Sequence, residues 1–277
     1  MTGISVPSAS APPTYTATEG LRAVAAEASK GLQLLWRRRT VLITTVITLG
    51  LIYLMIQFYV GAGHLNHGLL GATLPALFAY TLAATAALQG AGGISEEVNS
   101  GTLEQTHLSP AAPSLLVLGR LGALTVEGLV PAAILTALFW AGFGIHYTVR
   151  PDVFVPLLLT TLDAMAYGLL LVALTMAATG IGAITHVFNM MIMFFGGMFV
   201  PVIAFPHGVV IFARFIPTTL GVQVLNTTLS GRGLSASWTN GTLPWLLVHV
   251  VVLSGLAVAA YVYVIRRAQQ EGGLGQR

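Results

Sequence analysis

The chain has 277 residues, of which 55% are hydrophobic and only 8% are charged, and its mean hydropathy is +0.83. Soluble domains carry roughly 25% charged residues, so this composition excludes a soluble protein and indicates an integral membrane protein. The net charge of +3 reflects cations that flank membrane spans and gives no argument for nucleic-acid binding, while the absence of cysteine excludes disulfides, thiolate metal sites and cysteine nucleophiles.

The first 39 residues fall into two parts. Residues 1–18 are rich in Pro, Ser, Ala and Thr and lack the basic-then-apolar layout of a cleaved signal, so we expect a disordered tail. In residues 19–39 apolar residues recur at helical spacing opposite Arg22, Lys30 and Arg37. This pattern predicts an amphipathic helix along the membrane interface; the alternative is a basic flank without a stable helix.

Six later stretches are apolar and long enough to cross a membrane as helices, which takes roughly 20 residues. They cover residues 41–60, 68–94, 115–142, 156–179, 186–203 and 243–265. The fourth and fifth come from one apolar region, 153–213, which is too long for a single crossing and is divided at residues 180–182. None alternates as a barrel strand would, so the predicted fold class is an all-α integral membrane protein with six transmembrane helices.

Small residues recur four apart in the second predicted span, at Ala79, Ala83 and Ala87. Such faces favour close helix packing in lipid. Packing within the bundle and packing against a second subunit both fit the pattern.

Lys and Arg that flank spans stay on the cytoplasmic side. With an even number of spans, only Arg150, Arg214 and Arg232 of the 12 cations fall outside. The sequence therefore predicts an inner, or plasma, membrane protein with both termini cytoplasmic, including a tail at 268–277.

Residues 95–110 form the one acidic, strongly polar segment between spans. A short amphipathic stretch there stops at Ser109, because Pro110 disfavours helix at the residue before it. Glu96, Glu97 and Glu104 are placed to pair with cations on a cytosolic protein. The alternative is a solvated loop that merely connects two spans.

Ionisable residues inside the predicted spans are few. Glu127, Asp163 and His186 are the candidates for contact with an ion or substrate, and each has a purely structural alternative. Asp163 lies about two turns from the outer end of its span, where we expect water to reach it. His64 and His67 have no thiolate or nearby carboxylate, so we expect no metal site.

Pro206 and Pro217 bracket a short apolar interval, 207–216. As a helix it rises only about 15 Å, half the hydrocarbon core, so it cannot span. With Pro201 ending the preceding helix, we expect the segment to enter the outer leaflet and return, leaving Arg214 near outer headgroups. The alternative is a plain surface loop, which its apolar composition disfavours.

Two motifs resemble type-2 ABC export permeases. Residues 94–110 read Ile-Ser-Glu-Glu-Val-Asn-Ser-Gly-Thr-Leu-Glu-Gln-Thr-His-Leu-Ser-Pro and carry the family's E-x-x-x-G-T-L-E pattern, which docks on the ATPase. The matching residues are Glu97, Gly101, Thr102, Leu103 and Glu104. Residues 195–217, which begin Phe-Gly-Gly-Met-Phe-Val-Pro, are similar to the end of the family's fifth span and its re-entrant helices. The likeness covers about residues 20–267.

The resemblance implies a six-span subunit with an interfacial N-terminal helix, a coupling helix at 95–110 and re-entrant outer helices at 204–232. It also implies a second permease copy or homologue in the lipid bilayer, and cytosolic ATPases that bind ATP and Mg²⁺. The chain itself has a single lysine, Lys30, without a Gly-rich phosphate loop around it. We therefore expect no bound cofactor and no enzymatic activity in this chain.

The predicted function is the permease subunit of an ATP-driven ABC exporter that moves an amphipathic compound, such as a drug, antibiotic, lipid or glycolipid, out of the cell. The alternatives are an ion-coupled secondary transporter and a membrane scaffold without transport. The predicted site residues are Glu96, Glu97, Gly101, Thr102, Leu103 and Glu104 for ATPase coupling, Pro201, Pro206, Arg214 and Pro217 for an outer gate, and Glu127, Asp163, Phe195 and Phe199 for a substrate path.

Overall fold

A computed structural model describes residues 39–99, 113–177 and 182–271, together with Ser29, Gln33, Trp36 and Arg37. The predicted tail at 1–18, most of the predicted interfacial helix and coupling residues Gly101, Thr102, Leu103 and Glu104 lie outside this part of the chain. Every regular element in the described part is helical.

The chain runs through long helices, and a cluster of short ones precedes the last. The elements are α2 (Arg39–Val60), α3 (His67–Asn99), α5 (Pro113–Gly142), η1 (Pro151–Val153), α6 (Phe154–Ala177), α7 (Gly182–Phe195), η2 (Val202–Ala204), α8 (His207–Ala213), α9 (Thr219–Thr227), η3 (Thr228–Arg232), α10 (Gly233–Thr239) and α11 (Thr242–Glu271). In the described chain, 5 helices are long and apolar enough to cross a membrane: α2, α3, α5, α6 with η1, and α11.

The fifth predicted span, 186–203, is wrong in its bounds. Helix α7 begins at Gly182 and ends at Phe195, so its 14 residues rise only about 21 Å, short of the roughly 30 Å of a hydrocarbon core. The helix ends there because Gly197 has a φ of +95°, a left-handed conformation that a helix cannot continue through. Pro201 follows as the N-cap of the short helix η2.

Helices α3 and α6 form the centre of the bundle. In their spanning parts 78% and 61% of the residues are buried, against 17% for α2, 28% for α5 and 22% for α11. The two helices pack closely because small residues meet: a Cβ at Gly168 would lie 2.9 Å from the Cβ of Ala86. Ala79, Ala83 and Ala87 are fully buried within the chain, so the small-residue face packs inside the bundle.

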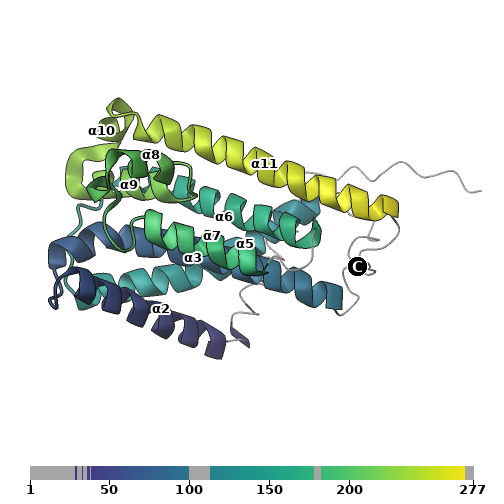
Figure 1. Ribbon diagram of the computed structural model, residues 1–277, viewed down its shortest axis with the longest axis horizontal. Coiled ribbons are helices and arrows are strands. Elements are labelled where there is room, and N and C mark those ends of the chain that lie inside the picture. Colours follow the sequence, from purple (N-terminus) through teal and green to yellow (C-terminus); the bar gives the residue numbers. More distant parts are fainter. Residues whose placement is uncertain are drawn as a thin grey trace, which may run out of the picture.

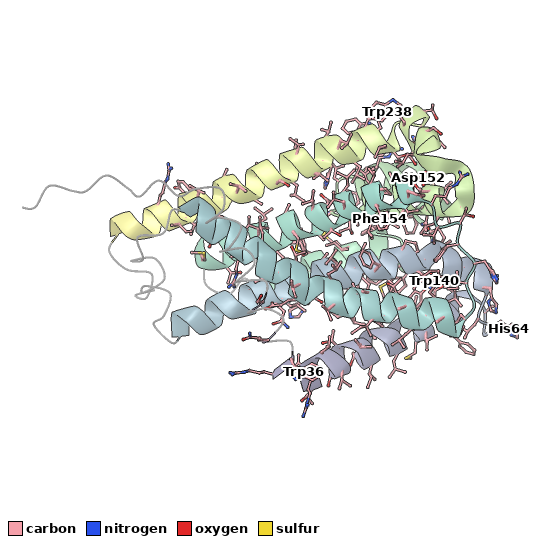
Figure 2. All side chains as sticks on the ribbon, turned by 180° about the vertical axis from the view of Figure 1, so that it is seen from behind. Trp36, His64, Trp140, Asp152, Phe154 and Trp238 are labelled. Carbon is pink, nitrogen blue, oxygen red and sulfur yellow. The ribbon has the colours of Figure 1, made fainter. Side chains whose placement is uncertain are left out.

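The short elements α8, α9 and α10 gather at one end of the molecule, beside the α2–α3 and α5–α6 turns (Figure 1). We call this the loop-rich end. The end of α3 and the C-terminal end of α11 lie at the opposite end. Trp140 and Trp238 lie at the loop-rich end and Trp36 near the opposite end of α2 (Figure 2). All three are exposed, as is typical of Trp at membrane interfaces.

Candidate functional site

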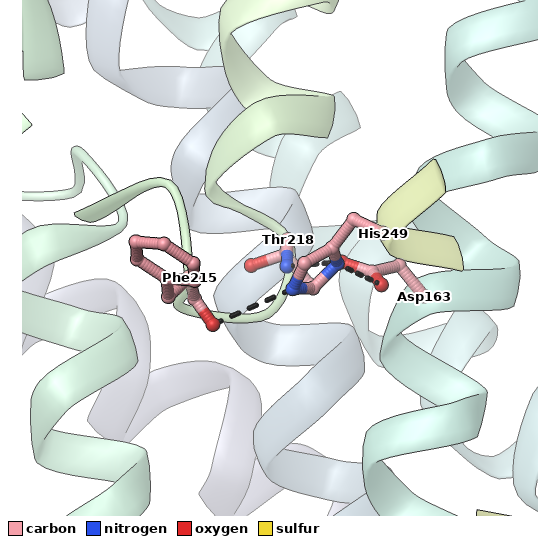
Figure 3. A network of polar contacts seen from close by, with 4 residues as sticks. All are labelled: Asp163, Phe215, Thr218 and His249. Atoms are coloured by element: carbon pink, nitrogen blue, oxygen red, sulfur yellow. Dashed lines mark hydrogen bonds and ion pairs between the residues drawn. The ribbon is translucent and has the colours of Figure 1, made fainter. Parts of the chain in front are cut away.

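A buried polar network centred on Asp163 ties the loop-rich end to the bundle. Asp163 of α6 is 0% exposed. Its Oδ2 accepts a hydrogen bond from the backbone N–H of Thr218 at 2.6 Å, and its Oδ1 lies 2.8 Å from Nδ1 of His249 on α11. Nε2 of His249 lies 3.4 Å from the carbonyl oxygen of Phe215 (Figure 3). One carboxyl group thus joins α6, α11 and the turn that leads into α9.

The backbone of that turn explains why the N–H of Thr218 points at the carboxyl group. Thr218 is the N-cap of α9 and has a φ of +69°. A left-handed conformation costs a non-glycine residue roughly 1–2 kcal/mol, and the hydrogen bond to Asp163 offsets part of that cost. A carboxyl group beside the first turn of α9 also complements the positive end of the helix dipole.

His249 is held between a carboxyl group and a carbonyl oxygen. A carbonyl oxygen only accepts hydrogen bonds, so Nε2 of His249 donates to Phe215. Nδ1 of the ring and the carboxyl group, 2.8 Å apart, share one hydrogen bond, whose donor depends on where the ring proton lies. The two contacts fix the orientation of the imidazole ring between α6 and the turn before α9.

The burial of Asp163 differs from the prediction. Water was expected to reach it near the outer end of its span, but α9 and α11 cover it completely. His249 was missed by the sequence reasoning, although the signal was available: it is the only histidine in a span, 243–265, that contains no Asp, Glu, Lys or Arg. Glu127 is half-buried on α5, which is not one of the elements that Asp163 joins.

Other polar side chains secure the segment where α7 ends early. The amide of Gln57 on α2 donates to the carbonyl oxygen of Met198 at 2.9 Å, and both residues are fully buried. On the other side, Tyr167 of α6 donates to Asn189 of α7 at 2.9 Å. Non-helical backbone at membrane depth is tolerated where protein groups satisfy it, and Gln57 does so for this segment.

Two predicted path residues, Phe195 and Phe199, lie at or just after the end of α7, and two predicted gate residues cap α8. Pro206 is the N-cap of α8 and Arg214 its C-cap. Phe195 packs edge-on against Phe212 of α8, with ring centroids 5.4 Å apart. Phe199 instead stacks on Phe194, at 4.5 Å. Phe195 therefore joins the end of α7 to the predicted gate, and Phe199 contacts α7 itself.

The two predicted coupling residues that the structure describes, Glu96 and Glu97, lie at the other end of the molecule. Glu96 and Glu97 are in the last turn of α3, which ends at Asn99. That end of α3 lies far from α8, α9 and α10 (Figure 1). The proposed energy input and the proposed gate are thus at opposite ends of the bundle, with the buried helices α3 and α6 running between them.

A cavity of about 1200 Å³ opens at the loop-rich end. Its wall includes three histidines and two arginines, His67, His146, His207, Arg214 and Arg232, and none of its wall residues is an Asp or a Glu. Within the residues that the structure describes, no three His, Asp or Glu side chains come together as a metal site would require.

Comparison with known proteins gives one match. A protein-family model described as ABC-2 type transporter matches residues 22–229, which is more than half of the chain. No curated protein matches the chain, and neither does any solved structure.

Proposed function

Because the chain belongs to the ABC-2 type transporter family, we propose that it is the permease subunit of an exporter that moves an amphipathic compound, such as a drug, antibiotic, lipid or glycolipid, out of the cell. It is a multi-pass membrane protein and a transport component, not itself a catalyst. The observation that carries the proposal is the family match over residues 22–229, which includes the whole acidic segment and the gate segment as far as η3.

The energy for transport comes from a separate cytosolic ATPase, which binds ATP and Mg²⁺. The chain has no phosphate-binding loop, since its single lysine, Lys30, lacks the glycines that cradle phosphates. The ATPase docks on residues 95–110, through Glu96, Glu97, Gly101, Thr102, Leu103 and Glu104. A movement received there reaches the gate through α3 and α6, the most buried helices.

The membrane orientation follows from charge. The end of the bundle that carries Arg266 and Arg267 lies opposite α8, α9 and α10, and cations that flank spans stay on the cytoplasmic side. The loop-rich end therefore faces outward, with both termini cytoplasmic, in the plasma membrane. The sixth crossing is made by α7 together with the buried non-helical segment 196–198. A second permease copy or homologue completes the transport route.

The segment from 204 to 232 acts as the outer gate. Asp163 fixes the start of α9 to α6 and α11, and Phe195 packs α8 against α7. Pro201, Pro206 and Pro217 set the turns between these short helices, and Arg214 ends α8. Opening of the gate therefore requires either that the hydrogen bond between Thr218 and Asp163 breaks or that Asp163 moves together with α9.

One observation favours a second candidate function, a proton-coupled transporter. Asp163 is fully buried and contacts His249, whose side chain is 17% exposed, and ionisable pairs inside a bundle are the kind of site that proton-driven transporters use. In this case a proton gradient, not ATP, would drive substrate movement.

Coupled ATP hydrolysis tests the exporter. The full chain is purified with candidate cytosolic ABC ATPases, and hydrolysis is measured with and without the chain in lipid nanodiscs. The native chain should bind one ATPase and change its hydrolysis rate, whereas Gly101→Pro and Glu104→Lys should weaken this effect. Glu271→Lys, which makes the same charge change at the end of α11, is the matched control. Equal effects of Glu104→Lys and Glu271→Lys would contradict docking of the ATPase on residues 95–110. ATP hydrolysis by the chain alone would contradict the proposal that the chain is an exporter driven by a separate ATPase.

A further inference from the structure

We propose that the cavity at the loop-rich end binds the anionic headgroup, a phosphate or a carboxylate, of an amphipathic molecule. As an assignment of the exporter's cargo this rests on the proposed function, but the binding site itself does not. The site is built from the wall residues of the cavity between α3, the α5–α6 turn, α8 and η3.

The charge of the wall selects an anion. Arg214 and Arg232 both line the cavity, as do three histidines, and no Asp or Glu side chain does. Asp152 of η1, which is not a wall residue, accepts a hydrogen bond at Oδ2 from the backbone N–H of Leu234 at 3.3 Å. Neither arginine forms an ion pair with another residue of the described chain. The positive charge of the wall is therefore left for a ligand or for solvent to balance.

Unused hydrogen-bond donors in the wall also indicate an anionic ligand. Part of the wall is occupied by its own bonds: Asn226 donates to the carbonyl oxygen of Ala72 at 2.9 Å, and Tyr147 to that of Gly71 at 2.7 Å. Nε of Arg214 and Nε2 of Gln223 are buried and find no acceptor among the described residues. Both groups are donors, so what the wall lacks is acceptors. Phosphate and carboxylate oxygens supply them.

The remaining wall and the size of the cavity indicate an amphiphile. Val202, Phe205 and Val210 line it beside the cations. A volume of about 1200 Å³ exceeds the roughly 300–1,000 Å³ of sites for drug-sized ligands, and an inorganic anion fills only a small part of it. A ligand whose headgroup lies at the arginines and whose apolar portion lies against α8 and η2 contacts both the cationic and the apolar wall residues.

Ligand binding to the full chain, without any ATPase, tests the site. The chain in detergent is titrated with dihexanoyl phosphatidic acid, with dihexanoyl phosphatidylcholine and with inorganic phosphate, and binding is followed by intrinsic tryptophan fluorescence. We expect the phosphatidic acid to bind at least about tenfold more tightly than either of the others, because only it combines an uncompensated charge with an apolar portion.

Arginine variants test where phosphatidic acid binds. Arg232→Gln and Arg214→Gln should each weaken phosphatidic acid binding at least about tenfold, while Arg266→Gln, the same change at the opposite end, should leave it unchanged. Arg232 is exposed, so its variant should fold even if Arg214→Gln does not. Equal binding of the two lipids, or equal loss in the Arg232→Gln and Arg266→Gln variants, would overturn the proposal. Inorganic phosphate binding as tightly as the lipid would overturn its amphiphilic part. Because no ATPase is present, these outcomes are independent of whether the chain works as an exporter.

Discussion

The bond between Thr218 and Asp163 should control how often the start of α9 opens. In the Asp163→Ala variant the backbone N–H of Thr218 loses its acceptor at 2.6 Å and stays in a site where the original carboxyl group was 0% exposed. A buried donor left without an acceptor costs about 1–3 kcal/mol. The free energy of local opening should fall by that amount, and the opening population should rise about 5- to 150-fold.

Hydrogen–deuterium exchange of the purified chain measures this opening directly. The amide of Thr218 should exchange about 5- to 150-fold faster in Asp163→Ala, and less so in Asp163→Asn, because the amide side chain keeps one oxygen acceptor. Amides in the buried middle of α3 serve as the internal reference and should keep their native rates. Unchanged exchange at Thr218 in Asp163→Ala would show that the hydrogen bond to Asp163 does not hold the start of α9. Equal acceleration in α3 would show that Asp163 supports the whole fold instead of this segment.

Three further outcomes are expected. Gly221→Ala places a Cβ 2.1 Å from Oγ1 of Thr160, so it should lower the free energy of unfolding in detergent by about 1–3 kcal/mol through overpacking. Gly255→Ala, where nothing lies within 4 Å, should be neutral or stabilising by up to about 1 kcal/mol, and the same response from both would contradict the packing of α9 on α6. Tyr167→Phe removes the bond to Asn189 and should cost about 1 kcal/mol in the same unfolding measurement; no change would mean that the bond does not help to hold α7. A single cysteine at Val210, in a chain without native cysteine, should react faster with a membrane-impermeant thiol reagent during ATP turnover than at rest, and equal rates would remove the gate.

Hydropathy predicted most of the fold because spanning helices must be long and apolar. It failed at α7 because the apolar character continues through Gly196 and Gly197, while the helical backbone conformation does not. Hydropathy measures side-chain transfer to lipid, whereas the end of this helix is set by a positive φ at Gly197. Two adjacent glycines before a proline are the signal that places the helix end.

The candidate site was predicted only in part. Asp163 stood out as a charge inside a span, but its partners could not be deduced from one sequence. His249 lies 86 residues away and the N–H of Thr218 lies 55 residues away, and only the packing of α6, α9 and α11 brings them together. The cavity has the same origin, since its wall combines residues from α3, the α5–α6 turn and the segment from 201 to 242.

Transport in sealed vesicles tests the central claim most directly. The chain is reconstituted with the ATPase that binds it, in inside-out vesicles, and uptake of a fluorescent anionic amphiphile is followed with ATP, with a non-hydrolysable ATP analogue, and with a protonophore. Uptake should need both the ATPase and hydrolysable ATP, and it should persist when the protonophore has collapsed the proton gradient. Uptake driven by a proton gradient in vesicles that contain this chain alone would contradict it.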